Sequence, residues 1–158
     1  MVRVTQVWIL FIALAASLAS AQSSQVKSAA STDRSQIVFT NNGPRPVGPY
    51  SQAVVAGGLV YVAGQTALDP ATGKLVEGDI AAQTDRVMTN ITAILAAGGS
   101  SLDRVVRTTV YLRSASDFSR MNQVYGKYFP SNPPARSTVI AEPPLAGALI
   151  EIDVIALK

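Results

Sequence analysis

The spacing of apolar residues constrains the fold of this chain more than any other feature of its sequence. After residue 35, short segments in which apolar residues alternate with period two are interrupted by only two segments with helical spacing. The sequence predicts strands at residues 37–40, 51–56, 59–63, 104–113, 136–141 and 148–157, with helices at 79–97 and 116–129. This order is typical of an α+β layer fold, in which two helices pack on one face of a mixed β-sheet.

Local signals mark the ends of several of these elements. The pair Gly57-Gly58 has the two-residue spacing of a tight hairpin turn between two strands. Asp79 is expected to cap the first helix, and Gly98 with the glycine after it is expected to end that helix. Ser116 is expected to cap the second helix.

Two of the predicted strands show which residues share a face. In residues 104–113, the alternation places on one face Val106, Thr108, Val110 and Leu112. The last predicted strand is apolar on both sides, with Ile150, Ile152, Val154 and Ala156 facing one way and Leu149, Ile155 and Leu157 the other. Because helices cover only one face, we expect the other face to meet a second copy of the chain in a homo-oligomer.

The composition limits the chemistry that this chain can use. Its 158 residues fit a single domain, and 48% hydrophobic against 15% charged residues is typical of a globular protein. The chain contains no His and no Cys, which excludes Ser-His-Asp and Cys-His nucleophilic sites, disulfides and Cys/His zinc sites. Any catalysis must therefore use Arg, Lys, Asp, Glu, Tyr, Asn, Ser or backbone groups.

The first 35 residues differ in composition from the rest of the chain. Arg3 precedes an apolar run, and the small residues that end at Ala21 are typical of a signal peptidase site. We therefore expect a secretory signal peptide at 1–21, a flexible arm at 22–35 and the folded domain at 36–158, in a protein that is periplasmic or secreted. The apolar run is too short for a stable membrane anchor. The low net charge gives no reason to expect a nucleic-acid partner.

The residues that point to a site are two acids, an arginine and a tyrosine. Glu151 and Asp153 alternate with apolar residues on the last predicted strand, so both carboxylates face one way. The nearest strand is expected to supply Arg136, whose planar guanidinium can also hold an external carboxylate. From this pattern two interpretations stay open: Arg136 and Glu151 form a site, or the acids pair with basic residues at an interface or lie at a solvated edge. Tyr50, in a Gly-Pro-Tyr loop, is either a packing residue or a donor in the site.

Two apparent motifs carry no functional signal. Residues 69–74 superficially resemble a phosphate-binding loop, but Leu68 and Leu75 stand where that loop needs Gly and Ser or Thr. We interpret this segment as a plain turn. Asn90 begins a glycosylation sequon, but it lies inside a predicted helix and is given no role.

Several short segments occur in a characteristic order. They are Gly48-Pro49-Tyr50-Ser51-Gln52-Ala53, Ala63-Gly64-Gln65, the run Arg107 to Leu112, Asp117-Phe118 with Asn122 and Tyr125, Pro134-Ala135-Arg136-Ser137, and Ile150-Glu151-Ile152. Together, from about residue 36 to the C-terminus, they closely resemble the RidA/YjgF family, also called the endoribonuclease L-PSP family. The resemblance implies a chorismate-mutase-like protomer, a homotrimer with sites between subunits, and hydrolysis of reactive enamines and imines such as 2-aminoacrylate to 2-oxo acids and ammonia. It implies no cofactor and no metal.

The resemblance also assigns roles to individual residues. Arg136 matches the arginine that grips the substrate carboxylate, and Glu151 matches the residue that positions or deprotonates the attacking water. Tyr50 and Asn122 match positions that line the site. Gly64 matches a position at which the backbone approaches the substrate, where a side chain would obstruct it. The implied ligand is a small imino or keto acid.

Two positions depart from the pattern of the family. Thr138, which matches a substrate-binding position, stands where some members have Cys, and Ala63 stands where many have Ser. The substrate preference is therefore open. Two other functions stay as alternatives: non-catalytic binding of small carboxylates in the same pocket, and RNA cleavage or translation inhibition, which the low net charge disfavours.

Overall fold

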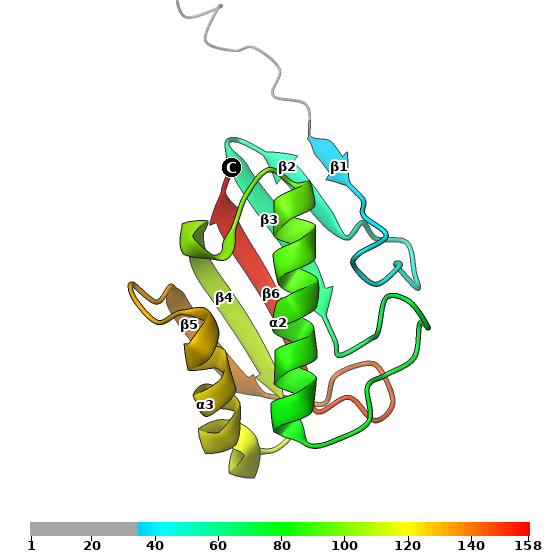
Figure 1. Cartoon of the computed structure of the whole chain (residues 1–158), viewed down its shortest axis with the longest axis vertical. Helices are drawn as coiled ribbons and strands as arrows, with labels where there is room; N and C mark the ends of the chain where they lie inside the picture. Colours follow the sequence, from blue (N-terminus) through cyan, green and yellow to red (C-terminus); the bar gives the residue numbers. More distant parts are fainter. Residues whose placement is uncertain (1–34) are drawn as a thin grey trace, which may run out of the picture. The chain divides into compact units, whose positions relative to one another are not determined.

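The computed structural model describes residues 35–158, which form one six-stranded sheet and two α-helices (Figure 1). The strands are β1 (Gln36–Val38), β2 (Ala53–Ala56), β3 (Leu59–Gln65), β4 (Val105–Leu112), β5 (Ala135–Ile140) and β6 (Ile150–Leu157). Across the sheet their order is β1-β2-β3-β6-β4-β5, and only β4 and β5 pair in parallel. The predicted α+β fold with a mixed sheet is confirmed.

Both helices cover the same face of the sheet. Figure 1 shows α2 (Ile80–Ala97) in front of the middle of the sheet and α3 (Phe118–Tyr128) beside it, in front of β4 and β5. The buried apolar residues of α2 recur at helical spacing: Ile80, Val87, Met88, Ile91, Ile94 and Leu95. They pack on the buried side of the sheet, where β6 supplies Ile150, Ile152, Val154 and Ala156. The core therefore lies between this face and the helices.

The predicted hairpin and the predicted cap of α2 are both present. Gly57 and Gly58 have φ angles of 58° and 75°, which glycine adopts without strain, and they connect β2 to β3. The Asp79 carboxylate accepts a hydrogen bond from the Ala82 N–H at 3.0 Å, which satisfies one of the free donors at the start of α2.

The start of α3 differs from the prediction. Ser116 does not cap this helix, because a short 3₁₀ turn, Ala115–Asp117, precedes it and α3 begins at Phe118. The Ser114 hydroxyl caps the 3₁₀ turn by accepting from the Ser116 N–H at 3.3 Å. The prediction of Ser116 as the cap is therefore wrong.

The alternation in β4 is interrupted at its first residues. The pairing of β4 with β6 shifts register between Val105 and Arg107. As a result Val105 is buried and Val106 is 42% exposed, so the prediction that Val106 shares a face with Thr108 is wrong. Thr108, Val110 and Leu112 do share one face, as predicted, and this face is buried.

The predicted signal peptide at 1–21, and the predicted arm at 22–35 except Ser35, lie outside the described residues. Between residues 35 and 158, the structure contains no helix that is both long and apolar enough to cross a membrane.

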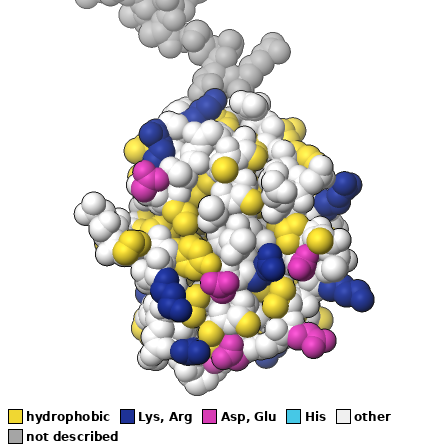
Figure 2. Space-filling view, in the orientation of Figure 1, with side chains coloured by type: hydrophobic (Ala, Val, Ile, Leu, Met, Phe, Trp, Pro, Cys, Tyr) yellow, Lys and Arg dark blue, Asp and Glu magenta, His cyan; other side chains and the backbone are white. Residues whose placement is uncertain are grey.

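The face of the sheet away from the helices leaves large apolar side chains uncovered in a single copy. Tyr61 on β3 and Val139 on β5 are 43% and 44% exposed, and Ile155 on β6, the pairing partner of Tyr61, is partly exposed. We refer to this side as the open face. The opposite side has an ordinary surface, in which basic, acidic and hydrophobic side chains are interspersed (Figure 2).

Candidate functional site

Glu151 and Asp153 lie together on the open face, as their spacing predicted. Their neighbours on β6 are buried against the helices, whereas both acids are half-buried. Glu151 is paired in register with Tyr111 of β4, and Asp153 with Thr109. Strand β6 therefore presents two carboxylates in the middle of an otherwise uncovered face.

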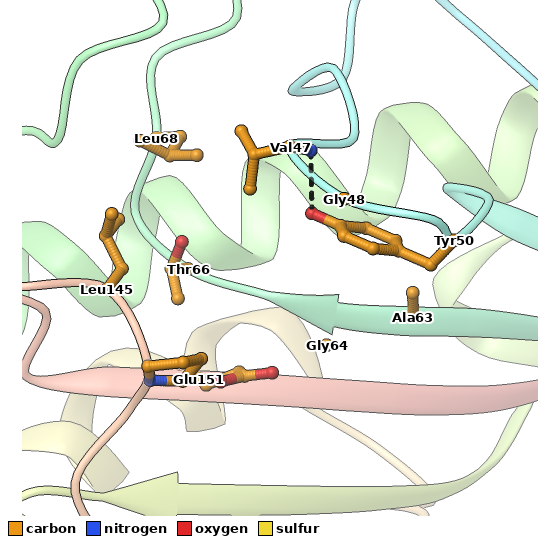
Figure 3. Close-up of a pocket in the computed structure, with 10 residues that line it drawn as sticks. Val47, Gly48, Tyr50, Ala63, Gly64, Thr66, Leu68, Leu145 and Glu151 are labelled. Carbon is orange, nitrogen blue, oxygen red and sulfur yellow. Dashed lines mark hydrogen bonds between the residues drawn. The ribbon is translucent and has the colours of Figure 1, made fainter.

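A pocket of about 380 Å³ opens beside Glu151 (Figure 3). It is lined by Val47, Gly48, Tyr50, Ala63, Gly64, Thr66, Leu68, Pro144, Leu145 and Glu151. In Figure 3 the Glu151 carboxylate points to the end of the pocket where Gly64 lies, whereas Leu68 and Leu145 stand at the other end. The pocket therefore has a polar end at the carboxyl and an apolar end between the two leucines.

The protein environment changes the acidity of Glu151. Burial raises the pKa of its carboxyl above the ordinary value, and the nearby Asp153 carboxylate raises it further. Asp153 also acts on Tyr111, where its charge is the main cause of a raised phenol pKa. A carboxyl whose pKa lies closer to neutral pH is suited to take a proton from water and to return it.

Gly64 on β3 makes room for this carboxyl. A Cβ atom at this position would overlap the Oε1 atom of Glu151 and would lie 2.8 Å from its Cδ atom. The resemblance assigns to Gly64 a close approach between backbone and substrate. The structure adds that the missing side chain also lets Glu151 occupy its present position.

Tyr50 lies on the wall of the same pocket rather than in the core. Its side chain is 47% exposed, and its hydroxyl accepts a hydrogen bond from the Val47 N–H at 3.3 Å (Figure 3). This contact ties the ring to the loop before β2. Of the two interpretations of Tyr50, the position of the ring favours a residue of the site.

Arg136 lies in a different pocket, of about 440 Å³, that Asn122 also lines. Its guanidinium carbon is 4.7 Å from the centre of the Tyr125 ring and 5.8 Å from that of Phe118. The Tyr125 hydroxyl in turn shares a buried hydrogen bond of 2.9 Å with Thr108, and burial raises the pKa of this phenol. The rings thus hold the guanidinium, whose N–H groups make no hydrogen bond with the described residues.

A single copy does not bring Arg136 and Glu151 together. Arg136 pairs with Thr108 of β4, which is buried on the helix side, so Arg136 lies on that side while Glu151 lies on the open face. The expectation that the strand of Arg136 is the nearest one to the last strand is wrong. Strand β4 lies between β5 and β6, because β6 enters the sheet between β3 and β4.

Thr138 joins neither group of residues in one copy. It lies on β5 opposite Val110, is half-buried, and lines neither the pocket of Glu151 nor that of Arg136.

Sequence reasoning missed the apolar end of the pocket and the ring under Arg136. Leu68 and Leu145 stand between the predicted strands and helices, where a large apolar side chain is a usable signal. The stacking of Arg136 on Tyr125 depends on long-range packing and has no local signal. Among residues 35–158, acidic side chains do not gather in a group of three or more that could hold a metal ion.

Known proteins resemble this chain over most of its length. A RutC family protein of Pyrococcus horikoshii is 49% identical over 123 residues, which cover 78% of this chain and 98% of that protein. The chloroplastic Reactive Intermediate Deaminase A of Arabidopsis thaliana is 44% identical over 128 residues, which cover 80% of this chain and 68% of that protein.

These relatives correct one expectation. The 123 matched residues already cover 98% of the Pyrococcus protein, so it has no counterpart of the predicted signal peptide at 1–21. The name of the plant relative places that protein in the chloroplast. These relatives therefore do not support the expectation of a signal peptide and of a secreted protein, and we withdraw it.

Solved structures share the fold as well as the sequence. RidA from the Antarctic bacterium Psychrobacter sp. PAMC 21119 is 40% identical, with a TM-score of 0.75 over 78% of this chain and 99% of that one. E. coli TdcF with bound serine is 31% identical, with a TM-score of 0.74 over 78% of this chain and 98% of that one. The family model described as endoribonuclease L-PSP matches residues 40–158. The chain is therefore a member of the RidA/YjgF family, the endoribonuclease L-PSP family.

Proposed function

We propose that this chain hydrolyses 2-imino acids to 2-oxo acids and ammonia, in sites that two copies of the chain build together. The observation that carries the proposal is the half-buried Glu151 carboxyl, with its raised pKa, at the polar end of a pocket of about 380 Å³. The similarity to a Reactive Intermediate Deaminase supports this class of reaction. The serine bound to TdcF supports a ligand that carries a carboxylate next to the reacting carbon.

The second copy is needed because the two charged groups lie on opposite sides of the sheet. In a cyclic homotrimer, the edge strand β5 of one copy would pack against the open face of the next. Arg136 of one copy would then reach the pocket of Glu151 in its neighbour. This arrangement also covers the apolar side chains of the open face, such as Tyr61 and Val139, which water otherwise contacts.

In the proposed reaction, the Arg136 guanidinium holds the substrate carboxylate through two charge-assisted hydrogen bonds. Glu151 takes one proton from a water molecule while the water oxygen bonds to the imine carbon. The proton then passes to the substrate nitrogen, the carbon–nitrogen bond breaks, and the second proton of the water leaves with the nitrogen as ammonia. An enamine such as 2-aminoacrylate enters this reaction after it tautomerises to the imine.

The direct test measures ammonia release from imino acids that an amino-acid oxidase generates in the assay. We expect the wild-type chain to accelerate release above the uncatalysed rate, and Arg136→Ala and Glu151→Gln to abolish the acceleration. Binding of 2-oxo acids without ammonia release would instead support the carboxylate-binding alternative. Wild-type rates for both variants would refute the proposed reaction.

The composite site has its own test. Arg136→Ala and Glu151→Ala are each expected to be inactive alone. In mixed trimers, a site between one copy of each variant can combine an intact arginine with an intact glutamate. Co-expression in equal amounts is expected to restore about one quarter of the wild-type activity, since about one interface in four has the productive order. No restoration in verified mixed trimers would show that both residues act within one copy.

A further inference from the structure

Two buried amide side chains connect helix α2 to the pocket. Gln83 and Asn90 are 3% and 0% exposed. They are seven residues apart, so they lie on the same face of α2 at a separation of about 10 Å along its axis. Each is a polar group among the apolar residues by which α2 contacts the sheet. The hydrogen bonds of the two amides account for their presence among these apolar residues.

Asn90 is hydrogen-bonded to the segment of Thr66 and Leu68, which forms one wall of the apolar end of the pocket. Its Nδ2 atom donates to the Leu68 carbonyl at 2.8 Å and to the Thr66 carbonyl at 3.4 Å, and both of these residues line the pocket. The Oδ1 atom of Asn90 has no hydrogen-bond partner among the described residues. An apolar side chain would fill the same space without burying an unsatisfied oxygen. The contribution of the amide is therefore its hold on the segment that carries Leu68.

Gln83 is hydrogen-bonded to the loop that carries Leu145, which forms the other wall of the apolar end. Its Oε1 atom accepts from the Leu149 N–H at 2.8 Å, and its Nε2 atom donates to the Gly147 carbonyl at 3.3 Å. Gly147 has a φ angle of 83° and ends the turn that carries Leu145, whereas Leu149 leads directly into β6 and Glu151. Gln83 therefore fixes the loop on which Leu145 stands relative to the strand of the acid.

We infer that Gln83 and Asn90 are positioning residues that set the separation of the two walls, and with it the size of the substrate side chain that the pocket accepts. This inference builds on the proposed function and deepens it. The apolar end lies between Leu68 and Leu145, away from the Glu151 carboxyl (Figure 3). The preferred substrates are then 2-imino acids with an apolar side chain larger than methyl.

The test compares a small and a large substrate. The variants are Asn90→Leu and Gln83→Met, which keep the side-chain size but remove the hydrogen bonds to the walls. The matched control is Thr84→Val, because the buried Thr84 hydroxyl donates only to the Ile80 carbonyl within α2. For each variant, kcat and KM are measured with 2-iminopropanoate and with 2-imino-4-methylpentanoate. The affinities for pyruvate and 4-methyl-2-oxopentanoate are measured by calorimetry.

We expect both wall variants to lose about tenfold of the preference for the larger substrate, through KM, while the control keeps the wild-type ratio. A purely structural role would lower the activity on both substrates equally, and that result would overturn the inference. If Gln83→Met does not fold, Asn90→Leu, which releases the opposite wall, is expected to shift the same ratio by itself. If the wild type binds both oxo acids but releases no ammonia, the proposed function is refuted. The positioning role is then decided by the ratio of the affinities for the two oxo acids, compared between the wild type and the wall variants. A wild type that binds neither oxo acid would overturn both.

Discussion

Gly64 and Glu151 share one small space on neighbouring strands, so the acid is sensitive to a single methyl group. In Gly64→Ala, the new Cβ would overlap the carboxyl and displace it from the pocket. Because a glutamate side chain is flexible, we expect the thermal stability to change by only a few degrees. The ammonia-release activity is expected to fall about 10²–10⁴-fold, the usual contribution of a positioned acid or base. Steady-state kinetics and thermal unfolding of the same sample measure both.

A double-mutant cycle provides the control for Gly64→Ala. The quantity compared is the affinity for pyruvate, measured by calorimetry, because it stays measurable in the inactive Glu151→Ala background. If the methyl group acts only through the carboxyl, Gly64→Ala is expected to cause no further loss of this affinity when Glu151 has already been replaced by Ala. A large additional loss in that background would show that Gly64 acts directly on the substrate, as the family resemblance alone suggests.

Asp153 affects the pH at which the Glu151 carboxyl ionises. Its negative charge raises the pKa of Glu151, so Asp153→Asn is expected to lower that pKa. If ionised Glu151 takes the proton from water, the acidic limb of the kcat/KM profile then moves to lower pH. Burial is the larger cause and is unchanged, so the limb stays above the ordinary glutamate value.

The matched control for Asp153→Asn is Glu142→Gln. Glu142 lines a pocket next to Glu151 and Asp153, but it is not among the causes of the raised pKa of Glu151. Its removal is expected to leave the acidic limb in place. An equal displacement in both variants would indicate a general effect of net charge rather than the Asp153–Glu151 pair.

At the scale of single elements, α2 supports both walls of the pocket and starts at a conventional cap. Asp79→Ala removes the hydrogen bond to the Ala82 N–H and is expected to lower the free energy of unfolding by about 1 kcal/mol. Asp79→Asn keeps the acceptor and is expected to cost much less. Urea denaturation of the two variants measures the difference, and an equal loss in both would mean that the cap does not stabilise the helix.

The elements that the sequence predicts well are those with local signals. Asp79 and the pair Gly57-Gly58 act on backbone groups within a few residues, and both have their expected roles. Ser116 failed as a cap because Ser114, two residues earlier, offers the same chemistry to a 3₁₀ turn. The bulge after Val105 depends on the pairing with β6, which no window of β4 alone reveals.

The same distinction between local signals and long-range pairing applies to the residues of the candidate site. The shared face of Glu151 and Asp153 follows from the period of one strand, and the sequence predicts it correctly. The position of Arg136 depends on which strands are neighbours. Because β6 inserts beside β4, the strands of Arg136 and Glu151 are not neighbours. The registers of β5 and β6 with β4 place the two side chains on opposite sides of the sheet, and only the fold reveals this.

At the scale of the whole molecule, the open face has to perform two tasks. It carries the carboxyl end of the pocket, and it leaves Tyr61 and Val139 exposed in a single copy. If copies associate through this face, the assembly completes the site and covers the apolar side chains at once. Association and catalysis are then expected to be lost together.

Tyr61→Lys tests this coupling, because it places a charge on the open face at a residue that lines neither pocket described above. Burying that charge at an interface without a partner is costly, so we expect the variant to sediment as a single copy. Ammonia release is expected to fall at least about 100-fold, since substrate positioning by Arg136 of the next copy is lost. Circular dichroism is expected to remain that of the folded chain.

Ala96→Lys adds the same charge to the exposed side of α2 and is expected to change neither assembly nor activity. A Tyr61→Lys protein that is monomeric yet fully active would show that one copy contains the whole site.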